Sequence, residues 1–251
     1  MARLVILVCC WLLGASAIAL ERVSVRADEW FPVNGEPYAD QPGFAIELLR
    51  QIFEPLEIEV DYRLLDWQRA LELASTGGTD CVVGAYHSEA PLLQFPRMPL
   101  AYDQSAFYVA TESDWHYQGL DSLNDRSIAV IGEYDYGAEL DQWIAQRPPN
   151  LHIAHGHDPL RRNLRMLLAD RVDALVESVL VMDAMLAEQG LTGRVKRAGL
   201  IGEPKPFYLA CVEGERGLSI VNLFDQRWQE LNATGELEKI YSRYNLPVPR
   251  P

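Results

Sequence analysis

The middle of the chain alternates between two patterns of hydrophobic residues. Apolar residues at every second position in residues 22–27 and 57–65 predict half-buried strands. Residues 79–86 contain a short apolar run that is typical of a buried strand. Residues 43–56 carry apolar side chains one helical turn apart, and residues 66–78 begin with an N-cap aspartate and end in glycines, so both predict helices.

A similar series follows further along the chain. Strand patterns in residues 127–132, 151–156 and 172–178 each precede a helical pattern. The second of these helices is expected to have Asp158 as its N-cap and Pro159 at its first position. Strands that alternate with helices form parallel sheets covered by helices, so the sequence predicts an α/β fold with two units, each built on its own sheet.

Three segments lie outside the two series. Residues 106–111 and 206–214 read as strands placed between the units in sequence. The C-terminal segment has a helical pattern that is broken near Gly235.

Within the second series, the helix after residues 127–132 is expected from about Tyr136 to Gln146, with Asp135 as its N-cap.

Composition and charge narrow the function. The chain has 251 residues, of which 49% are hydrophobic, enough for one large domain or two small ones. Its net charge is −14 and no basic stripe interrupts it, which excludes nucleic acid and anionic membrane surfaces as expected partners. We expect a monomer that needs no metal or cofactor and carries no catalytic residues.

Residues 1–19 have the pattern of an export signal. Arg3 supplies a short positive region, residues 4–13 are apolar, and Ala17 and Ala19 are placed for cleavage before Leu20. The apolar run is short for a membrane span. The alternative to an export signal is a buried N-terminal strand or helix. The sequence therefore predicts a mature protein in an oxidising periplasm. There, Cys81 and Cys211 form either one bridge or two buried thiols.

Several stretches resemble one family of proteins. Residues 28–36, 43–53 and 65–86 look like the first lobe of type II periplasmic solute-binding proteins, the family 3 relatives of polar amino-acid receptors of ABC transporters. Residues 122–140 and 167–178 look like the second lobe, and residues 207–245 look like the returning chain and closing helices.

The resemblance implies a two-lobed fold with a hinge. Lobe 1 would contain residues 20–105 and 210–251, and lobe 2 would contain residues 106–209. A small solute would bind in the cleft between the lobes, and hinge closure would bury it. The partner would be an ABC permease or a membrane sensor.

The resemblance also points to ligand-binding residues in the first lobe. Trp30 matches an aromatic residue that stacks on the ligand, and Trp67 matches one that covers its other face, although either could be a core residue. Gly84, Ala85 and Tyr86 follow a strand at the place where the family holds an anionic group of the ligand.

Two charged anchors of an amino-acid pocket are missing at their matching positions. The arginine that would bind the α-carboxylate is replaced by Pro91, and Arg97 is the nearest substitute. The aspartate that would bind the amino group is replaced by Ser178, while the adjacent Glu177 is expected to point to the other face of its strand. In lobe 2, Tyr134 and Asp135 are the remaining candidates at a helix start.

Three functions are consistent with these features. The first is a transport receptor for a small solute, and the second is a periplasmic sensor or accessory binding protein without a permease. The third is an enzyme of the same fold, similar to a cyclohexadienyl dehydratase, which the resemblance alone does not separate from a receptor. A buried carboxylate with a raised pKa would favour the enzyme, and a cleft of aromatic residues and amides would favour a receptor. His152, His155 and His157 are interpreted as strand-end residues rather than metal ligands.

Overall fold

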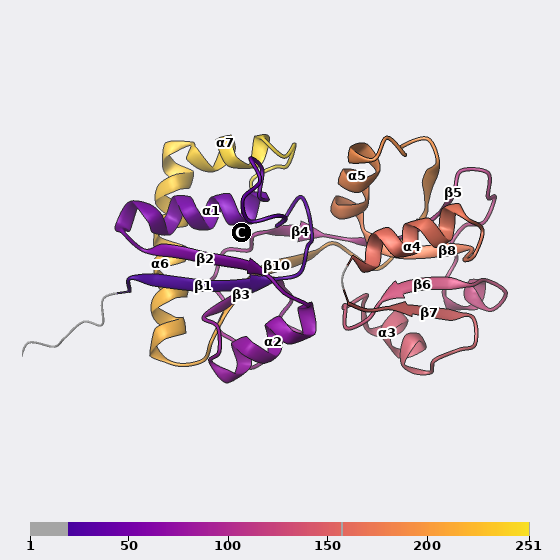
Figure 1. Ribbon diagram of the computed structural model, residues 1–251, viewed down its shortest axis with the longest axis horizontal. Coiled ribbons are helices and arrows are strands. Elements are labelled where there is room, and N and C mark those ends of the chain that lie inside the picture. Colours follow the sequence, from indigo (N-terminus) through magenta and orange to yellow (C-terminus); the bar gives the residue numbers. More distant parts are fainter. Residues whose placement is uncertain (1–19, 157, 251) are drawn as a thin grey trace, which may run out of the picture.

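The computed structural model describes residues 20–250 except residue 157. Within these residues the chain forms two lobes side by side, each built on a five-stranded sheet with helices on both faces (Figure 1). The α/β class and the two-lobed architecture expected from the sequence are confirmed. The predicted export signal, residues 1–19, lies outside the described residues.

The sheet of lobe 1 takes strands from both ends of the chain. Its strand order is β2-β1-β3-β10-β4, with β1 parallel to β2 and β3, and β10 antiparallel to its neighbours. The strands are β1 (Arg22–Ala27), β2 (Glu59–Leu64), β3 (Cys81–Ala85), β4 (Ala101–Asp103) and β10 (Lys205–Cys211). The helices of this lobe are α1 (Phe44–Phe53), α2 (Trp67–Thr76), α6 (Glu215–Thr234) and α7 (Glu236–Ser242), with the short 3-10 helix η1 (Glu54–Leu56) after α1.

The sheet of lobe 2 is formed by the middle of the chain. Its strand order is β7-β6-β8-β5-β9, with β6 parallel to β7 and β8, and β5 antiparallel to β8 and β9. The strands are β5 (Ser105–Ala110), β6 (Ile128–Ile131), β7 (Leu151–Ala154), β8 (Ala174–Ser178) and β9 (Val195–Leu200). The helices are α3 (Ala138–Ala145), α4 (Pro159–Leu168) and α5 (Val179–Glu188), with the 3-10 helix η2 (Leu120–Leu123) before β6.

The hydrophobic patterns explain which faces are buried. Val23, Val25 and Ala27 of β1 are fully buried, while the residues between them are at least partly exposed. The strands β3, β6 and β8 are buried along their whole length, as expected for strands covered by helices on both faces. These strands place their carboxyl ends toward the junction between the lobes (Figure 1).

The chain crosses between the lobes twice. β4 leads into β5 through Gln104 alone, and β9 leads back into β10 after four residues. The unpaired segments at the crossings are therefore short. Such a two-segment connection permits a hinge motion in which few residues change conformation.

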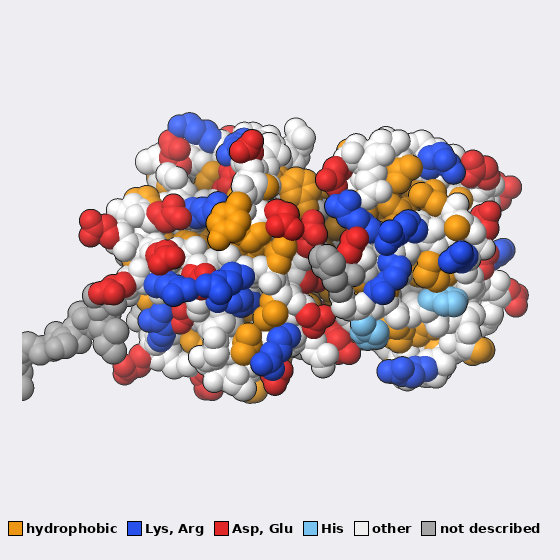
Figure 2. Space-filling view, viewed as in Figure 1, with side chains coloured by type: hydrophobic (Ala, Val, Ile, Leu, Met, Phe, Trp, Pro, Cys, Tyr) orange, Lys and Arg blue, Asp and Glu red, His pale blue; other side chains and the backbone are white. Residues whose placement is uncertain are grey.

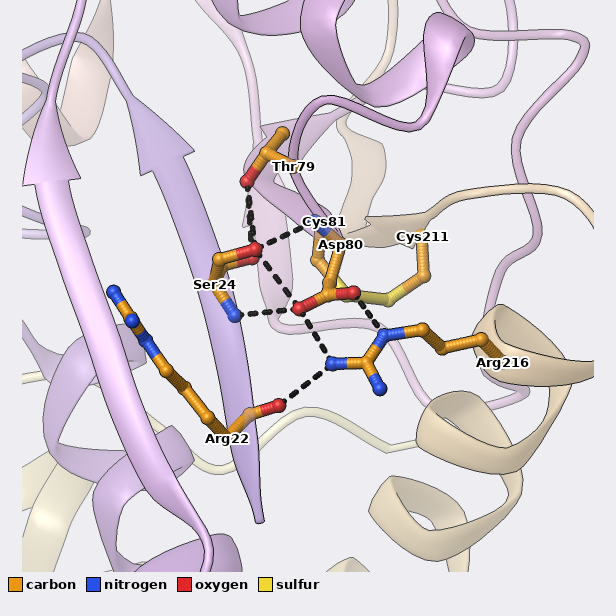
Figure 3. The surroundings of a disulfide bond; sticks show 7 residues. All are labelled: Arg22, Ser24, Thr79, Asp80, Cys81, Cys211 and Arg216. Atoms are coloured by element: carbon orange, nitrogen blue, oxygen red, sulfur yellow. Dashed lines mark hydrogen bonds and ion pairs between the residues drawn. A yellow bond between two sulfur atoms is a disulfide. The ribbon is translucent and has the colours of Figure 1, made fainter. Parts of the chain in front are cut away.

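A disulfide joins Cys81 of β3 to Cys211 of β10, which lie opposite one another in the sheet of lobe 1 (Figure 3). The two residues are 130 positions apart, so the bridge encloses the whole of lobe 2 in sequence. Beside it, Asp80 accepts hydrogen bonds from the backbone N and Oγ of Ser24, each 2.8 Å long, and forms an ion pair with Arg216 of α6. This end of β3 is thereby fastened to its neighbours.

Some local expectations differ from the structure. Helix α3 begins at Ala138 with Gly137 as its N-cap, so the expectation that Asp135 is the N-cap is wrong. Asp158 does precede α4, but its backbone is left-handed and its side chain makes no capping bond. The short strand β4 and the strand β9 were not expected, because both contain too few apolar residues at regular spacing. No helix in the described part of the chain is both long and apolar enough to cross a membrane.

Candidate functional site

The cleft between the lobes contains a cavity of about 290 Å³. Lobe 1 contributes the residues that follow β1 and β2, and lobe 2 contributes the residues that follow β6, β7 and β8. Carboxyl ends of strands are the usual ligand site of open α/β sheets. Figure 2 shows acidic side chains gathered along this junction, with arginine and lysine side chains on the adjoining face of lobe 2.

A smaller chamber of about 30 Å³ lies beside this cavity and shares several of its walls. A cavity needs roughly 10–15 Å³ by this measure to hold one water molecule, so the chamber has room for a single small polar group. The residues lining both spaces are Asp28, Trp30, Trp67, Tyr134 and Glu177. The smaller chamber, which we call the inner chamber, is further lined by Val83, Gly84, Tyr86, Glu89, Asp103, Ser105, Asp135, Tyr136 and Ser178.

Aromatic side chains form much of the wall. Trp30 packs its edge on Phe207, with ring centroids 5.0 Å apart, and Trp67 also packs into the core of lobe 1. Both tryptophans are more than nine-tenths buried and still border the two spaces. Each tryptophan therefore belongs to the core of lobe 1 and also lines the cleft. The sequence had left these two positions as alternatives.

Gly84 at the end of β3 allows Trp30 to lie against the backbone. Its φ is +95°, a conformation that residues with a side chain rarely adopt. A Cβ atom at this position would lie 3.3 Å from the indole ring of Trp30. The positive φ therefore favours glycine here, and the close approach of the ring adds to that preference.

Asp28 connects the lobes across the cleft. Its carboxylate accepts a hydrogen bond from the hydroxyl of Tyr134, and the two residues belong to lobe 1 and lobe 2 respectively. Burial raises the pKa of Asp28 to about 6, although the bond from Tyr134 acts in the opposite direction. The carboxyl therefore changes its charge close to neutral pH.

Glu177 lies in the cleft, and the expectation that it points to the other face of β8 is wrong. It lines both spaces and is 1% exposed. The strand ends at Ser178, where the chain turns into α5, so the last two residues of β8 both border the cleft. Strict alternation of faces holds only while a strand continues.

The two carboxyl oxygens of Glu177 differ. Oε1 accepts a 2.7 Å hydrogen bond from the backbone N of Ser178, whereas Oε2 is buried and has no partner among the described residues. Burial, and then the nearby Asp103 and Asp28, raise the pKa of Glu177 to about 8. The indole N–H of Trp30 lies near enough to offset part of this rise, but it completes no hydrogen bond.

Ser178 has a structural role as well as a place in the wall. Its Oγ donates a 2.7 Å hydrogen bond to Asp103 of β4 and accepts a 3.3 Å bond from the backbone N of Val181, which caps α5. Tyr86 donates to the other oxygen of Asp103 over 3.4 Å. Burial raises the pKa of Asp103, while these bonds lower it. Ser178 and Asp103 thus form a second link between the lobes.

Two more carboxyls complete the inner chamber. Burial raises the pKa of Glu89 to about 7, although the side chain accepts a 3.0 Å bond from the backbone N of Tyr86. Asp135 accepts hydrogen bonds from Ser88 and from Lys205. Burial would raise the pKa of Asp135, but these partners outweigh it and the pKa is lowered. The charge of Lys205 is thereby neutralised by a partner.

The structure brings together most residues expected at the site. Two of the expected residues do not line the cleft. Ala85 is buried in the core beside Trp67, and Arg97 is exposed, with its backbone N bonded to Asp225 of α6. The expected residues that line one or both spaces are Trp30, Trp67, Gly84, Tyr86, Tyr134, Asp135 and Ser178.

The buried carboxyls were missed in the sequence. Asp28, Asp103 and Glu177 stand at or directly after strand ends, and that position was a usable signal for Asp28 and Glu177. Asp103 could not be recognised, because β4 was not expected. Glu89 sits in a turn and offered no signal.

The family follows from a comparison of the sequence with known protein families. The family of bacterial extracellular solute-binding proteins, family 3, matches residues 27–247. The chain belongs to this family. No curated protein sequence gives a match.

Several solved structures have folds similar to that of this family 3 protein. A histidine kinase sensor domain with similarity to periplasmic binding proteins shares 20% identity and a TM-score of 0.75, over 91% of this chain and 98% of the other. A structure described for glutathione import through a cystine ABC importer of Streptococcus mutans shares 17% identity and a TM-score of 0.77, over 92% and 98%. An ancestral amino-acid-binding protein, a precursor of cyclohexadienyl dehydratase, shares 18% identity and a TM-score of 0.69, over 89% and 95%.

At such identities the likeness shows the fold alone. The three similar proteins differ in what their names say they do: one senses, one is tied to import and one is the forerunner of an enzyme. The ligand and role of this family 3 protein must therefore be argued from its own cleft residues.

Proposed function

We propose that this family 3 protein is an exported receptor that captures a small solute in the cleft between its lobes. The observation that carries the proposal is the cavity of about 290 Å³, which is walled by strand ends of both lobes. A solute held there contacts both lobes, so binding favours the closed arrangement over the open one.

The links already present across the cleft support this mechanism. Asp28 binds Tyr134, Asp103 binds Ser178, and Ser88 binds Asp135, and each pair spans the two lobes. A solute that adds contacts to both sides would shift the hinge equilibrium further by its difference in affinity for the two states. We propose that the closed form is then read by an ABC permease or a membrane sensor, since similar structures include one described for import through an ABC importer and a sensor domain of a histidine kinase.

An enzyme of the dehydratase type is the second candidate, because Glu177 and Asp28 are buried carboxyls with raised pKa values. Against it, the substrates of such enzymes carry carboxylates, which need a cationic partner. Arg161, which lines the larger cavity, is paired with Asp158 and Glu188, Lys205 is paired with Asp135, and Arg97 lies outside the cleft. The charge of the lining therefore favours the receptor.

The proposal predicts that one class of solute stabilises the folded protein. A thermal-shift screen against amino acids, organic acids, sugars and amines should give a rise in melting temperature that grows with solute concentration, because the solute binds only the folded form. Replacing Trp30 or Trp67 by alanine should weaken the binding of that solute by about 1 kcal/mol or more, the size of an aromatic contact.

Tyr38→Ala is the matched control, since Tyr38 is 98% exposed and lies outside both spaces. Titration calorimetry below the melting temperature of each variant separates lost affinity from lost stability. Unchanged affinity in both tryptophan variants would contradict a site in the cleft.

A further inference from the structure

We propose that the cleft binds a linear aliphatic diamine or polyamine, a solute with cationic nitrogens and no carboxylate. This inference rests on the proposed receptor function and specifies its ligand. Four features of the described residues carry it: the charge of the lining, one orphaned acceptor, the aromatic walls and the missing anchor for a carboxylate.

The lining is strongly acidic. Within the described residues, the two spaces are bordered by one arginine, Arg161, and by ten carboxyl side chains. Arg161 lies within 3.5 Å of carboxyl oxygens of Asp158 and Glu188, so its charge is already matched. The carboxyls are Asp28, Glu29, Asp66, Glu89, Asp103, Glu133, Asp135, Asp158, Glu177 and Glu188. Asp158 and Glu188 are matched by Arg161 and Asp135 by Lys205, whereas the other seven carboxyls form no ion pair within the described residues. These unpaired groups favour a cationic solute and disfavour an anionic one.

The buried Oε2 of Glu177 points to a missing hydrogen-bond donor. A buried acceptor without a partner is costly, and a charged carboxylate more so. An ammonium group beside this oxygen would supply the donor and, by its charge, stabilise the ionised form of Glu177. The chamber of about 30 Å³ has the size for such a group.

The remaining walls suit an alkyl chain between two cationic ends. Trp30, Trp67 and Tyr134 border both spaces and offer apolar faces to methylene groups, as well as π-faces to an ammonium. A second group of carboxyls, Glu29 and Asp66, borders the larger cavity but not the inner chamber. One nitrogen therefore binds in the chamber beside Glu177 and the other in the outer cavity.

A carboxylate on the solute would lack a partner. Pro91 stands where the family resemblance expects the carboxylate-binding arginine, Arg97 is exposed elsewhere, and Lys205 is paired with Asp135 at 2.8 Å. Burying an unpaired carboxylate opposes binding. A plain amino acid should thus bind more weakly than the amine that lacks only its carboxylate.

The test compares matched solutes by titration calorimetry on the full mature protein. The probes are 1,5-diaminopentane and lysine, which differ by one carboxylate, followed by a linear triamine, a neutral sugar and a dicarboxylic acid. We expect the diamine to bind at least ten-fold more tightly than lysine. Glu177→Gln preserves the shape of the side chain and removes its charge, and it should weaken the affinity for the diamine at least ten-fold. Glu238 is exposed on α7, so Glu238→Gln should leave the affinity for the diamine unchanged.

Each result has a defined meaning. Lysine binding as tightly as the diamine, or a sugar or acid binding in place of the amines, overturns the inference and leaves the receptor function standing. Diamine affinity that persists in a folded Glu177→Gln protein overturns the assigned site. No binding by either amine overturns the inference, and the receptor function is then decided by the wider thermal-shift screen.

Discussion

Glu177 and Asp28 are buried carboxyls whose protonation depends on burial and on neighbouring groups from both lobes. Burial raises the pKa of Glu177 to about 8 and that of Asp28 to about 6, against ordinary values near 4. The groups facing Glu177 are Asp103, Asp28, the backbone N of Ser178 and the indole of Trp30. The first two oppose its charge, so these surroundings favour a protonated Glu177 at neutral pH.

This shift predicts a pH dependence of stability. The unfolded chain ionises Glu177 near pH 4.5, whereas the folded protein holds the proton until about pH 8. The stabilising contribution is therefore complete below about pH 4.5 and is lost as the pH rises through 8. The slope per group is at most about 1.4 kcal/mol per pH unit. Urea unfolding at several pH values between 5 and 9 should show this decline.

The variant Glu177→Gln should flatten the decline, because its amide does not titrate, and Glu238→Gln should follow the wild type. An equally steep curve in both variants would show that Glu177 is ionised in the folded protein. In the presence of an amine, binding should release protons between pH 6 and 8, since the cation favours the charged carboxylate.

Among the strands, β3 and β10 carry the covalent constraint of lobe 1. Replacing both Cys81 and Cys211 by alanine removes a bridge that closes a loop across 130 residues. The chain-entropy model gives a loss of roughly 4–5 kcal/mol in unfolding free energy for a loop of this length. Guanidinium unfolding of the double variant against the wild type measures it.

Affinity for the solute should change little in the same variant, since neither cysteine lines the cleft. The control is the wild type with its bridge reduced, which should lose stability by a similar amount. A double variant as stable as the wild type would contradict a constraint carried by the bridge.

The sequence predicted helices and parallel strands well where the pattern was regular. β1, β3 and β8 and the helices α1 and α2 were recognised from apolar spacing and caps, which local physics determines. β4, with three residues, was not recognised, because it exists through its pairing with β10. The site was predicted where an aromatic residue follows a strand, as with Trp30.

The acidic side of the site escaped prediction for a related reason. Glu177 appeared to point away because its strand was treated as continuing, and Asp103 belongs to the unrecognised β4. The role of a carboxyl group depends on its burial, and burial in the cleft depends on how the two lobes pack together. A single sequence does not specify that packing. The absence of a matched arginine at Pro91 was visible in the sequence and agrees with the lining of the cleft.

In the whole molecule, the two lobes are connected by short crossings and by side-chain bonds across the cleft. The bonds Asp28–Tyr134 and Asp103–Ser178 each join lobe 1 to lobe 2. A cation between them would neutralise the repelling carboxyls on both sides. Contacts to both lobes would stabilise the closed form, as the proposed receptor function requires.

Hydrogen-exchange mass spectrometry tests this account most directly, with and without saturating 1,5-diaminopentane. We expect slower exchange in residues 28–31 and 64–68 of lobe 1 and in residues 131–134 and 177–181 of lobe 2, because the solute contacts both sides of the cleft. Protection confined to one lobe, or the absence of protection in all four segments, would contradict capture between the lobes.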